Sequence, residues 1–285
     1  FYGAQDGQMA ATAGFVNVAF EPDWGDWNSI DGRKAINDRI VTRLVEARRY
    51  GIETALIQIG HIAYQRDGDT FRMTGADILK PTLRYLLTQL EAYRIMESIE
   101  INFYPLDEVN GYHVPEATVA EINEDIRSVM TEFPKLRGGK LAVIYSCDGD
   151  WTAIDTYDWY GCDDYGAGSN IFYTAYFQSL KALRKPHQRL LLVPGGALGQ
   201  DPRPFLDYAL ENPEEVVGVI TFIWFDNWAN TGRRGVESNG MAQAYWLMGM
   251  RLAHPELPNP NCREAPPKVA LSVNGVREIS VPVGA

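Results

Sequence analysis

The chain repeats one pattern: a short apolar run, a polar or glycine-rich loop, and then a longer stretch with helical spacing. This alternation is typical of a parallel β-sheet whose strands are joined by helices. Several of the runs are almost continuously apolar, as expected for strands covered on both faces. The predicted strands are residues 15–20, 53–59, 100–106, 141–146, 156–161, 189–193 and 216–224, and residues 1–5 are the candidate for an eighth.

Helical spacing fills most of the intervals between these runs. Ile36, Ile40 and Leu44 recur on one face of the first interval, and Pro115 suits the first turn of a helix in the third. The segment 156–161 follows the preceding strand without a clear helix between them. The predicted helices are residues 31–50, 74–96, 114–133, 171–184, 201–211 and 238–253.

Seven or eight strands with this rhythm favour an α/β fold of the (β/α)8 TIM type over an open doubly wound sheet. An open sheet that binds nucleotides usually has a glycine-rich turn after its first strand. The Gly-Gly-Ala-Leu-Gly segment at residues 195–199 comes late and lacks that spacing. We expect residues 1–254 to form the barrel domain, and residues 255–285 to form a proline-rich linker with a C-terminal β segment.

Composition and charge narrow the possible partners. The net charge of −11 argues against nucleic acid, because a phosphate footprint needs clustered Lys and Arg. No apolar run approaches the roughly 20 residues that a membrane span needs. The chain starts at Phe1 without a charged and then apolar leader, which is typical of a mature product or a domain excised from a larger polypeptide or assembly. An extracellular or secreted location is favoured.

The three cysteines show no metal-site spacing, and neither a metal site nor a cofactor is predicted. Cys147 and Cys162 follow neighbouring predicted strands and could pair. An odd count leaves at least one thiol without an intramolecular partner. Free buried thiols are the favoured interpretation.

Candidate chemistry gathers where the predicted strands end, which in a (β/α)8 barrel is the face that carries the active site. The acidic residues there are Glu21, Asp23, Asp107, Glu108, Asp148, Asp150, Asp163, Asp164 and Asp226, and His61 ends the second strand. Aromatic residues stand beside them, namely Trp24, Trp27, Trp151, Trp159, Tyr160, Tyr165, Trp224 and Trp228. Converging carboxyls with aromatic platforms suit glycoside hydrolysis, in which one carboxyl protonates the leaving oxygen while an anion supports an oxocarbenium-like centre.

The segment 101–110, INFYPLDEVN, resembles the fourth strand of barrel glycoside hydrolases. In many of these enzymes that strand ends in Asn-Glu, with the Glu as general acid/base. The segment 222–228, FIWFDNW, is similar to the tryptophan-bearing last strand of the same enzymes. The resemblance implies Glu108 as the acid/base, Asp107 as its neighbour, and Trp224 or Trp228 as a sugar platform.

One feature departs from this family. Retaining members carry a nucleophilic Glu at the end of strand seven, whereas here the corresponding segment 193–201, VPGGALGQD, has only Asp201, well beyond the strand. Two interpretations remain open. In the first, the chain resembles substrate-assisted hexosaminidases: Asp107 orients a 2-acetamido group and Glu108 protonates the leaving group, with Tyr160 or Tyr165 as a partner. In the second, a carboxylate of strand five or six serves as base or nucleophile, and the candidates are Asp148, Asp163 and Asp164.

Simpler explanations exist for each candidate. Asp107 and Glu108 could cap a helix, although residues 109–114 separate them from the helix near Pro115. Asp163 and Asp164 could form a solvated turn, His61 could be a core histidine, and Glu21 and Trp24 could belong to a solvated loop. Two other functions are considered. One is a metal-dependent polysaccharide deacetylase using His61, His113 and the aspartates at the strand ends, and the other is a non-catalytic carbohydrate-binding or structural barrel module.

Overall fold

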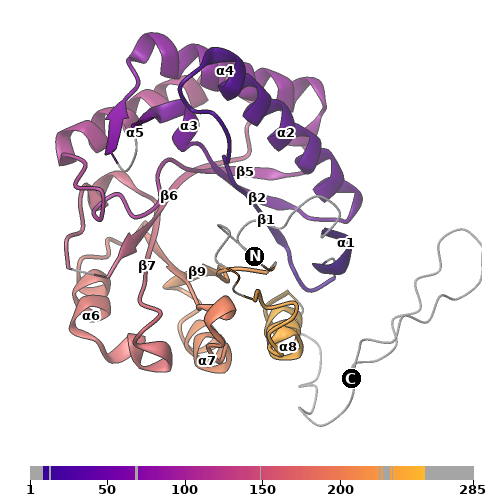
Figure 1. Ribbon diagram of the computed structural model, residues 1–285, viewed down its shortest axis with the longest axis vertical. Coiled ribbons are helices and arrows are strands. Elements are labelled where there is room, and N and C mark those ends of the chain that lie inside the picture. The colour runs from indigo at the N-terminus through magenta and orange to yellow at the C-terminus, as the bar shows by residue number, and fades with distance from the viewer. Residues whose placement is uncertain are drawn as a thin grey trace, which may run out of the picture.

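The parallel sheet curls around a central axis with helices on its outside, as the view down that axis shows (Figure 1). This computed structural model describes residues 9–12, 14–67, 70–147, 149–224, 226, 232 and 234–253. Seven strands pair in the order β1-β2-β5-β6-β7-β8-β9, and every pairing is parallel. They are β1 (Val18–Glu21), β2 (Thr54–Gln58), β5 (Glu100–Tyr104), β6 (Gly138–Ser146), β7 (Trp159–Asp163), β8 (Arg189–Leu192) and β9 (Val216–Val219). The seven predicted strands and the α/β barrel class are confirmed, whereas residues 1–5 lie outside the described residues.

Helices occupy the predicted intervals and pack their apolar faces against the sheet. The longer ones are α2 (Ile30–Arg49), α4 (Ala76–Ala92), α5 (Glu116–Met130), α6 (Ala175–Ala182), α7 (Arg203–Glu211) and α8 (Ala242–Ala253). Short helices are α1 (Met9–Thr12), α3 (Gly60–Ala63), η1 (Ile95–Glu97), η2 (Ile154–Thr156), η3 (Gly168–Tyr173) and η4 (Gly196–Leu198). Among the described residues between β6 and β7, the one helix is the short η2, so the irregular crossover predicted there is confirmed. In the part of the chain that the structure describes, no helix combines the length and apolarity needed to cross a membrane.

The core follows from the helical spacing seen in the sequence. Ile36, Ile40 and Leu44 of α2 are buried against the sheet, and the Ser29 hydroxyl caps this helix by accepting a hydrogen bond from the Gly32 N–H. A second apolar cluster forms beside α8 around Phe15, Trp224, Val236, Tyr245 and Met248. Residues 254–285, which include the predicted proline-rich segment, lie outside the described residues.

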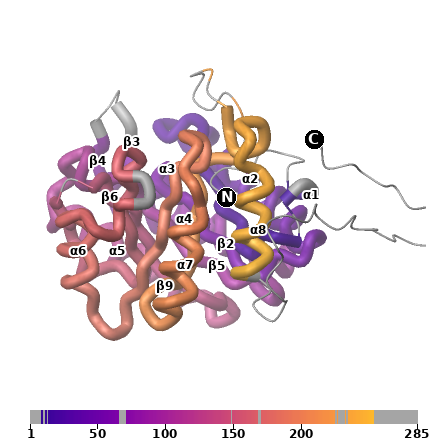
Figure 2. Tube along the Cα trace, turned by 90° about the horizontal axis from the view of Figure 1, so that it is seen from below, coloured from indigo at the N-terminus to yellow at the C-terminus, as the bar shows by residue number. Residues whose placement is uncertain are grey.

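One antiparallel hairpin was not predicted. It consists of β3 (Tyr64–Asp67) and β4 (Thr70–Met73) and follows β2 through the short helix α3. The two strands lie side by side at one edge of the molecule (Figure 2). Their sequences, YQRD and TFRM, mix apolar and charged residues over only four positions, so no apolar run marked them as strands.

A disulfide joins Cys147 to Cys162 at the ends of β6 and β7. The expectation of free thiols at these two positions was therefore wrong. The parallel register sets Tyr145 opposite Cys162 and Ser146 opposite Asp163, which brings the two cysteine Cα atoms to 5.4 Å. That separation is within the usual range for a disulfide. This register between β6 and β7 cannot be derived from the spacing of the cysteines along the sequence.

Candidate active site

The loop that follows β5 leaves the extended conformation before it reaches the Asp107–Glu108 pair. The strand ends at Tyr104, and Glu108 adopts a positive φ of 46°. Adjacent residues of a strand point to opposite faces, so this change of direction allows both carboxyls to serve one site. Left-handed backbone at a residue other than glycine is costly and is concentrated at functional sites. The Glu108 N–H donates to the Ile144 carbonyl at 3.0 Å, which ties the turn to β6.

Asn110 fixes the same loop to the end of β6. Its side-chain amide donates to the Ser146 carbonyl at 2.8 Å, and its side-chain oxygen accepts from the Ser146 N–H at 3.1 Å. Asn110 is buried, so these hydrogen bonds are protected from competing water. Together with the Glu108–Ile144 bond they hold the turn against β6 before any substrate arrives.

The carboxyl of Asp163 lies within electrostatic reach of this loop. Asp163 is the last residue of β7 and is half-buried. Burial, together with the nearby charges of Asp107 and Glu108, raises the pKa of Asp163 to about 8, while a hydrogen bond with Tyr165 works in the opposite direction. The structure therefore brings Asp107, Glu108 and Asp163 together. With this pKa, the carboxyl of Asp163 keeps its proton at neutral pH.

Two tyrosines hold this cluster in place. The Tyr104 hydroxyl donates a hydrogen bond to Asp107, and the buried Tyr104 ring packs edge-on against Phe20 with centroids 5.6 Å apart. The Tyr165 ring stacks on Phe222 at 5.4 Å, and the Tyr165 carbonyl accepts from Gln200 at 2.8 Å. Tyr165 is thus placed beside Asp163, as a partner of the carboxyl cluster.

Asp164 has a different environment from its neighbour. One of its carboxylate oxygens accepts the N–H groups of Gly166 and Ala167, each at 3.0 Å. This pattern stabilises a turn. Asp226 makes a similar arrangement, because its Oδ1 accepts from the Gly235 N–H at 2.7 Å and from the Ser238 hydroxyl. Both carboxylates organise loops in this structure.

The acidic end of β1 and the histidine after β2 belong to a buried polar network. Glu21 is fully buried and forms an ion pair with Arg43 of α2 at 2.8 Å. His61 is also fully buried, with Nε2 at 2.8 Å from Asn37 and Nδ1 at 3.5 Å from Asp23. Burial lowers the pKa of His61 despite the nearby Asp23, so its ring is neutral near pH 7. These contacts place Glu21 and His61 in the interior.

The predicted aromatic platforms divide between interior and surface. Trp224 is only 5% exposed and packs on Phe15 with centroids 5.8 Å apart, and Tyr160 is fully buried. Trp151 is half-buried, and its indole N–H donates to the Ser179 hydroxyl of α6 at 3.1 Å. Trp24 is exposed. Asp148 and Trp228 lie outside the described residues.

Several residues at the site were not identified from the sequence. Tyr104 lies three positions before Asp107, and Asn110 lies two positions after Glu108. Their polar groups are close to the end of a predicted strand, and this proximity could have identified them as candidates. Phe71 and Tyr112 were also not identified, and with Trp27, an aromatic residue noted in the sequence, they form a row of rings next to the same loop. That row depends on the hairpin β3–β4, which the sequence pattern did not predict.

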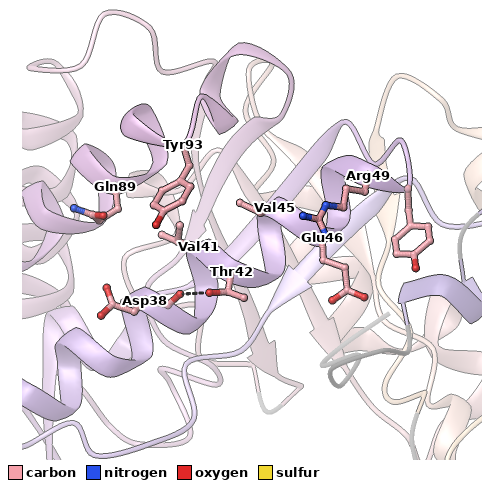
Figure 3. A pocket seen from close by; sticks show the side chains of 9 residues that line it. Asp38, Val41, Thr42, Val45, Glu46, Arg49, Gln89 and Tyr93 are labelled. Carbon is pink, nitrogen blue, oxygen red and sulfur yellow. Dashed lines mark hydrogen bonds between the residues drawn. The ribbon is translucent and has the colours of Figure 1, made fainter.

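Two further features lie away from the carboxyl cluster. Among the described residues, no group of three or more His, Cys, Asp and Glu side chains is arranged to hold a metal ion. A groove of about 590 Å³ runs along the outer surface of α2 and α4 (Figure 3). Its lining residues are Asp38, Val41, Thr42, Val45, Glu46, Arg49, Tyr50, Gln89 and Tyr93. Arg49 and Tyr93 end their helices, and crossover helices run antiparallel to the strands, so this groove extends toward the opposite face of the barrel.

Comparisons with known proteins identify the fold. No protein-family model matches the chain, and no curated protein matches it in sequence. Among solved structures, a fungal β-1,4-galactanase aligns with a TM-score of 0.55 at 13% identity, covering 82% of this chain and 86% of the galactanase. A β-mannanase from Alicyclobacillus acidocaldarius aligns with a TM-score of 0.51 at 14% identity, covering 86% and 90%. At such low sequence identities the likeness establishes the barrel fold, and the function has to be argued from the residues of this chain.

Proposed function

We propose that this protein is a glycoside hydrolase that cleaves a polysaccharide or oligosaccharide by carboxyl acid/base catalysis. The observation that carries the proposal is the raised pKa of Asp163, about 8, caused by burial and by the Asp107 and Glu108 anions. Glycoside hydrolysis needs a protonated carboxyl and an anionic carboxyl at one centre. A cluster that retains one proton at neutral pH meets that requirement.

Glu108 and Asp163 are the proposed acid/base pair. At neutral pH this cluster holds a proton, which passes to the oxygen of the leaving sugar as the glycosidic bond breaks. The anion left in the cluster stabilises the positive charge that develops on the anomeric carbon, and it then takes a proton from the water molecule that adds to this carbon. Because Glu108 is fixed to β6 and Asp163 ends β7, both groups are held by the barrel frame rather than by a mobile loop.

Asp107 is proposed to support this pair. Its hydrogen bond from Tyr104 fixes one carboxylate oxygen. In a substrate-assisted reaction the Asp107 carboxylate would orient a 2-acetamido group, whose carbonyl attacks the anomeric carbon. The adjacent Asp-Glu pair supports this form of the mechanism, and a substrate with an acetamido group tests it.

The cellular setting proposed for the protein is extracellular. The Cys147–Cys162 disulfide supports an oxidising compartment, since such bonds persist in secreted proteins and are rare in the cytosol. A carbohydrate substrate also agrees with the acidic net charge of −11, which does not favour nucleic acid.

The direct test is hydrolysis of defined polysaccharides. We would incubate the purified protein with β-1,4-galactan, β-1,4-mannan, cellulose and chitin, and measure the release of reducing ends. Glu108→Gln should abolish release from the polymer that the native protein cleaves. Glu46→Gln removes a carboxylate from the groove along α2 and α4 and should leave the rate unchanged, which makes it the matched control. Equal loss in both variants would contradict the assignment of Glu108.

A second candidate is a carbohydrate-binding barrel without catalysis. The segment 193–200 after β8 carries no carboxylate, although retaining relatives of the resembled family have a Glu there. Under this alternative the protein binds one of the four polymers, and neither wild type nor Glu108→Gln releases reducing ends. The deacetylase alternative used His61 together with His113 and the aspartates at the strand ends, and the contacts of His61 with Asn37 and Asp23 place it in the core.

A further inference from the structure

We propose that Trp27, Phe71 and Tyr112 form an aromatic strip that binds a pyranose ring of the substrate next to Glu108. The inference rests on the proposed function and extends it, because it assigns a sugar-binding surface to the hairpin β3–β4. Phe71 and Tyr112 are not among the groups that the sequence was expected to use for chemistry, and Trp27 was noted only as an aromatic residue near carboxylates. The strip is defined here as these three side chains.

The three rings form a continuous row. The Trp27 and Phe71 centroids are 5.7 Å apart with an interplanar angle of 53°, and the Phe71 and Tyr112 centroids are 4.3 Å apart at 58°. Trp27 and Phe71 are half-buried, whereas Tyr112 is 38% exposed. The row therefore begins in the packed interior of the loops and ends at solvent. A partly exposed aromatic ring held by its neighbours suits the stacking of a flat ligand.

The exposed end of the strip touches the loop that carries the carboxyls. The Tyr112 N–H donates to the Glu108 carbonyl at 3.2 Å, so Tyr112 is one helical turn from the proposed catalytic residue. Gly111 packs against the same turn, since a side chain at this position would approach the Glu108 carbonyl to 3.3 Å. A sugar on Tyr112 is thereby adjacent to one bound at the carboxyl cluster.

The other end of the strip also reaches this loop. A Cβ on Gly60 would lie 2.7 Å from the tip of the Trp27 ring and 3.2 Å from the Pro105 carbonyl, which shows how closely Trp27 approaches the end of β5. The Trp27 indole N–H donates to the Asp23 carbonyl at 2.8 Å and fixes the ring. Both ends of the strip thus border the segment 105–112.

Hydrogen bonds from Arg33 and Thr74 hold the hairpin that carries Phe71 in place. Arg33 of α2 donates to the carbonyls of His61, Ile62 and Tyr64 around the start of the hairpin. Thr74, just after β4, donates through its N–H to the Ala63 carbonyl at 2.9 Å and through its hydroxyl to the Ile62 carbonyl at 2.7 Å. Arg33 and Thr74 are both buried. The strip is therefore a fixed surface, which reduces the entropy lost when a ligand binds.

These features specify the chemical class of the ligand. Pyranose rings whose axial C–H groups form an apolar face stack on aromatic rings, while their hydroxyls stay in water at the edges. A strip that leads away from the carboxyl cluster fits a chain of at least two such sugars better than a single monosaccharide. The expected ligand is therefore an oligosaccharide that runs from the cluster across Tyr112 toward Phe71.

The test measures binding separately from cleavage. In a Glu108→Gln background, calorimetry would follow the tetrasaccharides of β-1,4-galactose, β-1,4-mannose, β-1,4-glucose and β-1,4-N-acetylglucosamine. Tyr112→Ala and Phe71→Leu should each weaken binding of the preferred tetrasaccharide by roughly 5- to 100-fold. Tyr112→Phe keeps the ring and should retain the affinity. Tyr93→Ala removes a phenol that is 55% exposed in the groove along α2 and α4, and should have no effect.

The outcomes separate this inference from the proposed function. Unchanged affinity in Tyr112→Ala and Phe71→Leu would overturn the strip, even if the wild type cleaves the polymer. Failure of all four tetrasaccharides to bind would overturn it as well. Weakened binding in these variants, with wild-type melting temperatures and rescue by Tyr112→Phe, would support the strip even if the wild type releases no reducing ends. In that case only the proposed hydrolysis would be lost.

Discussion

The carboxyls of Glu108 and Asp163, which follow β5 and end β7 with β6 between them, are close enough that the Glu108 anion raises the pKa of Asp163. This relationship depends on two local features of the loop after β5. The backbone turns left-handed at Glu108, and Asn110 fastens the turn to Ser146. The carboxyl of Asp163 at the end of β7 and the carboxyl of Glu108 in the turn after β5 therefore influence each other's ionisation.

The raised pKa of Asp163 predicts how stability depends on pH. The pKa is higher in the folded protein, about 8, than its ordinary value of 3.8, so folding favours the protonated carboxyl. This contribution is present below about pH 4 and is lost as the pH rises through about 8. Asp163→Asn cannot ionise, so its melting temperature should exceed that of the wild type at about pH 9, with a smaller difference at about pH 5. Asp164→Asn provides the comparison, and a constant difference for Asp163→Asn at both pH values would contradict the prediction.

The leaving group should reveal which carboxyl delivers the proton. Glu108→Gln should lower turnover of a natural glycoside by roughly 10²–10⁴-fold and leave binding nearly intact. An aryl glycoside with a good leaving group needs little protonation, so part of this loss should disappear. Parallel measurements on Asp163→Asn complete the assignment, because rescue of Asp163→Asn but not Glu108→Gln would transfer the proton-donor role to Asp163.

Asp107 should respond to a different property of the substrate. Under substrate assistance, Asp107→Asn should impair hydrolysis even of an activated aryl glycoside, provided that the sugar carries a 2-acetamido group. The matched glycoside without that group should be cleaved at similar rates by variant and wild type. If Asp107→Asn affects both substrates equally, Asp107 acts through the charge of the cluster rather than through the acetamido group.

The sequence predicted most of the architecture, because strands such as β5 and β6 are covered on both faces and their apolar runs are unambiguous. It also placed Asp107, Glu108 and Asp163 at strand ends of one barrel face. The sequence could not show which acidic residues at the strand ends are catalytic, because the role of each depends on its partner from another helix, strand or loop. Glu21, like Glu108, follows a predicted apolar run, yet in the structure it ends β1 and forms a buried ion pair with Arg43 of α2.

Trp224 and the disulfide show the same limit. Trp224 was expected to line the cleft, but the structure packs its ring beside Phe15, and α8 residues such as Tyr245 and Met248 belong to the same cluster. Burial by residues that are distant in the sequence leaves no pattern in the sequence around Trp224. The pairing of Cys147 with Cys162 depends on the register between β6 and β7, which the apolar runs do not determine.

The disulfide should contribute measurably to stability. It joins residues 15 positions apart, and closing a loop of that length in the unfolded chain corresponds to about 3 kcal/mol. The double variant Cys147→Ser/Cys162→Ser should therefore unfold at lower denaturant concentration, and reduction of the wild type with dithiothreitol should produce the same midpoint. The double variant itself should not respond to dithiothreitol. Equal midpoints for oxidised and reduced wild type would contradict the prediction.

Asn110 should act as a positioning residue for Glu108. Asn110→Ala removes both hydrogen bonds to the backbone N–H and carbonyl of the half-buried Ser146, which should cost roughly 1–3 kcal/mol of stability. It should also lower kcat by about tenfold or more with little change in KM, because a carboxyl displaced from its working geometry loses transition-state stabilisation. Asn123 is an equally buried asparagine, whose amide donates to the Thr156 hydroxyl at 2.7 Å, away from the carboxyls. Asn123→Ala should destabilise the fold without changing kcat. If the two variants lose stability alike and kcat stays at the wild-type value in both, Asn110 supports the fold alone and has no part in positioning Glu108.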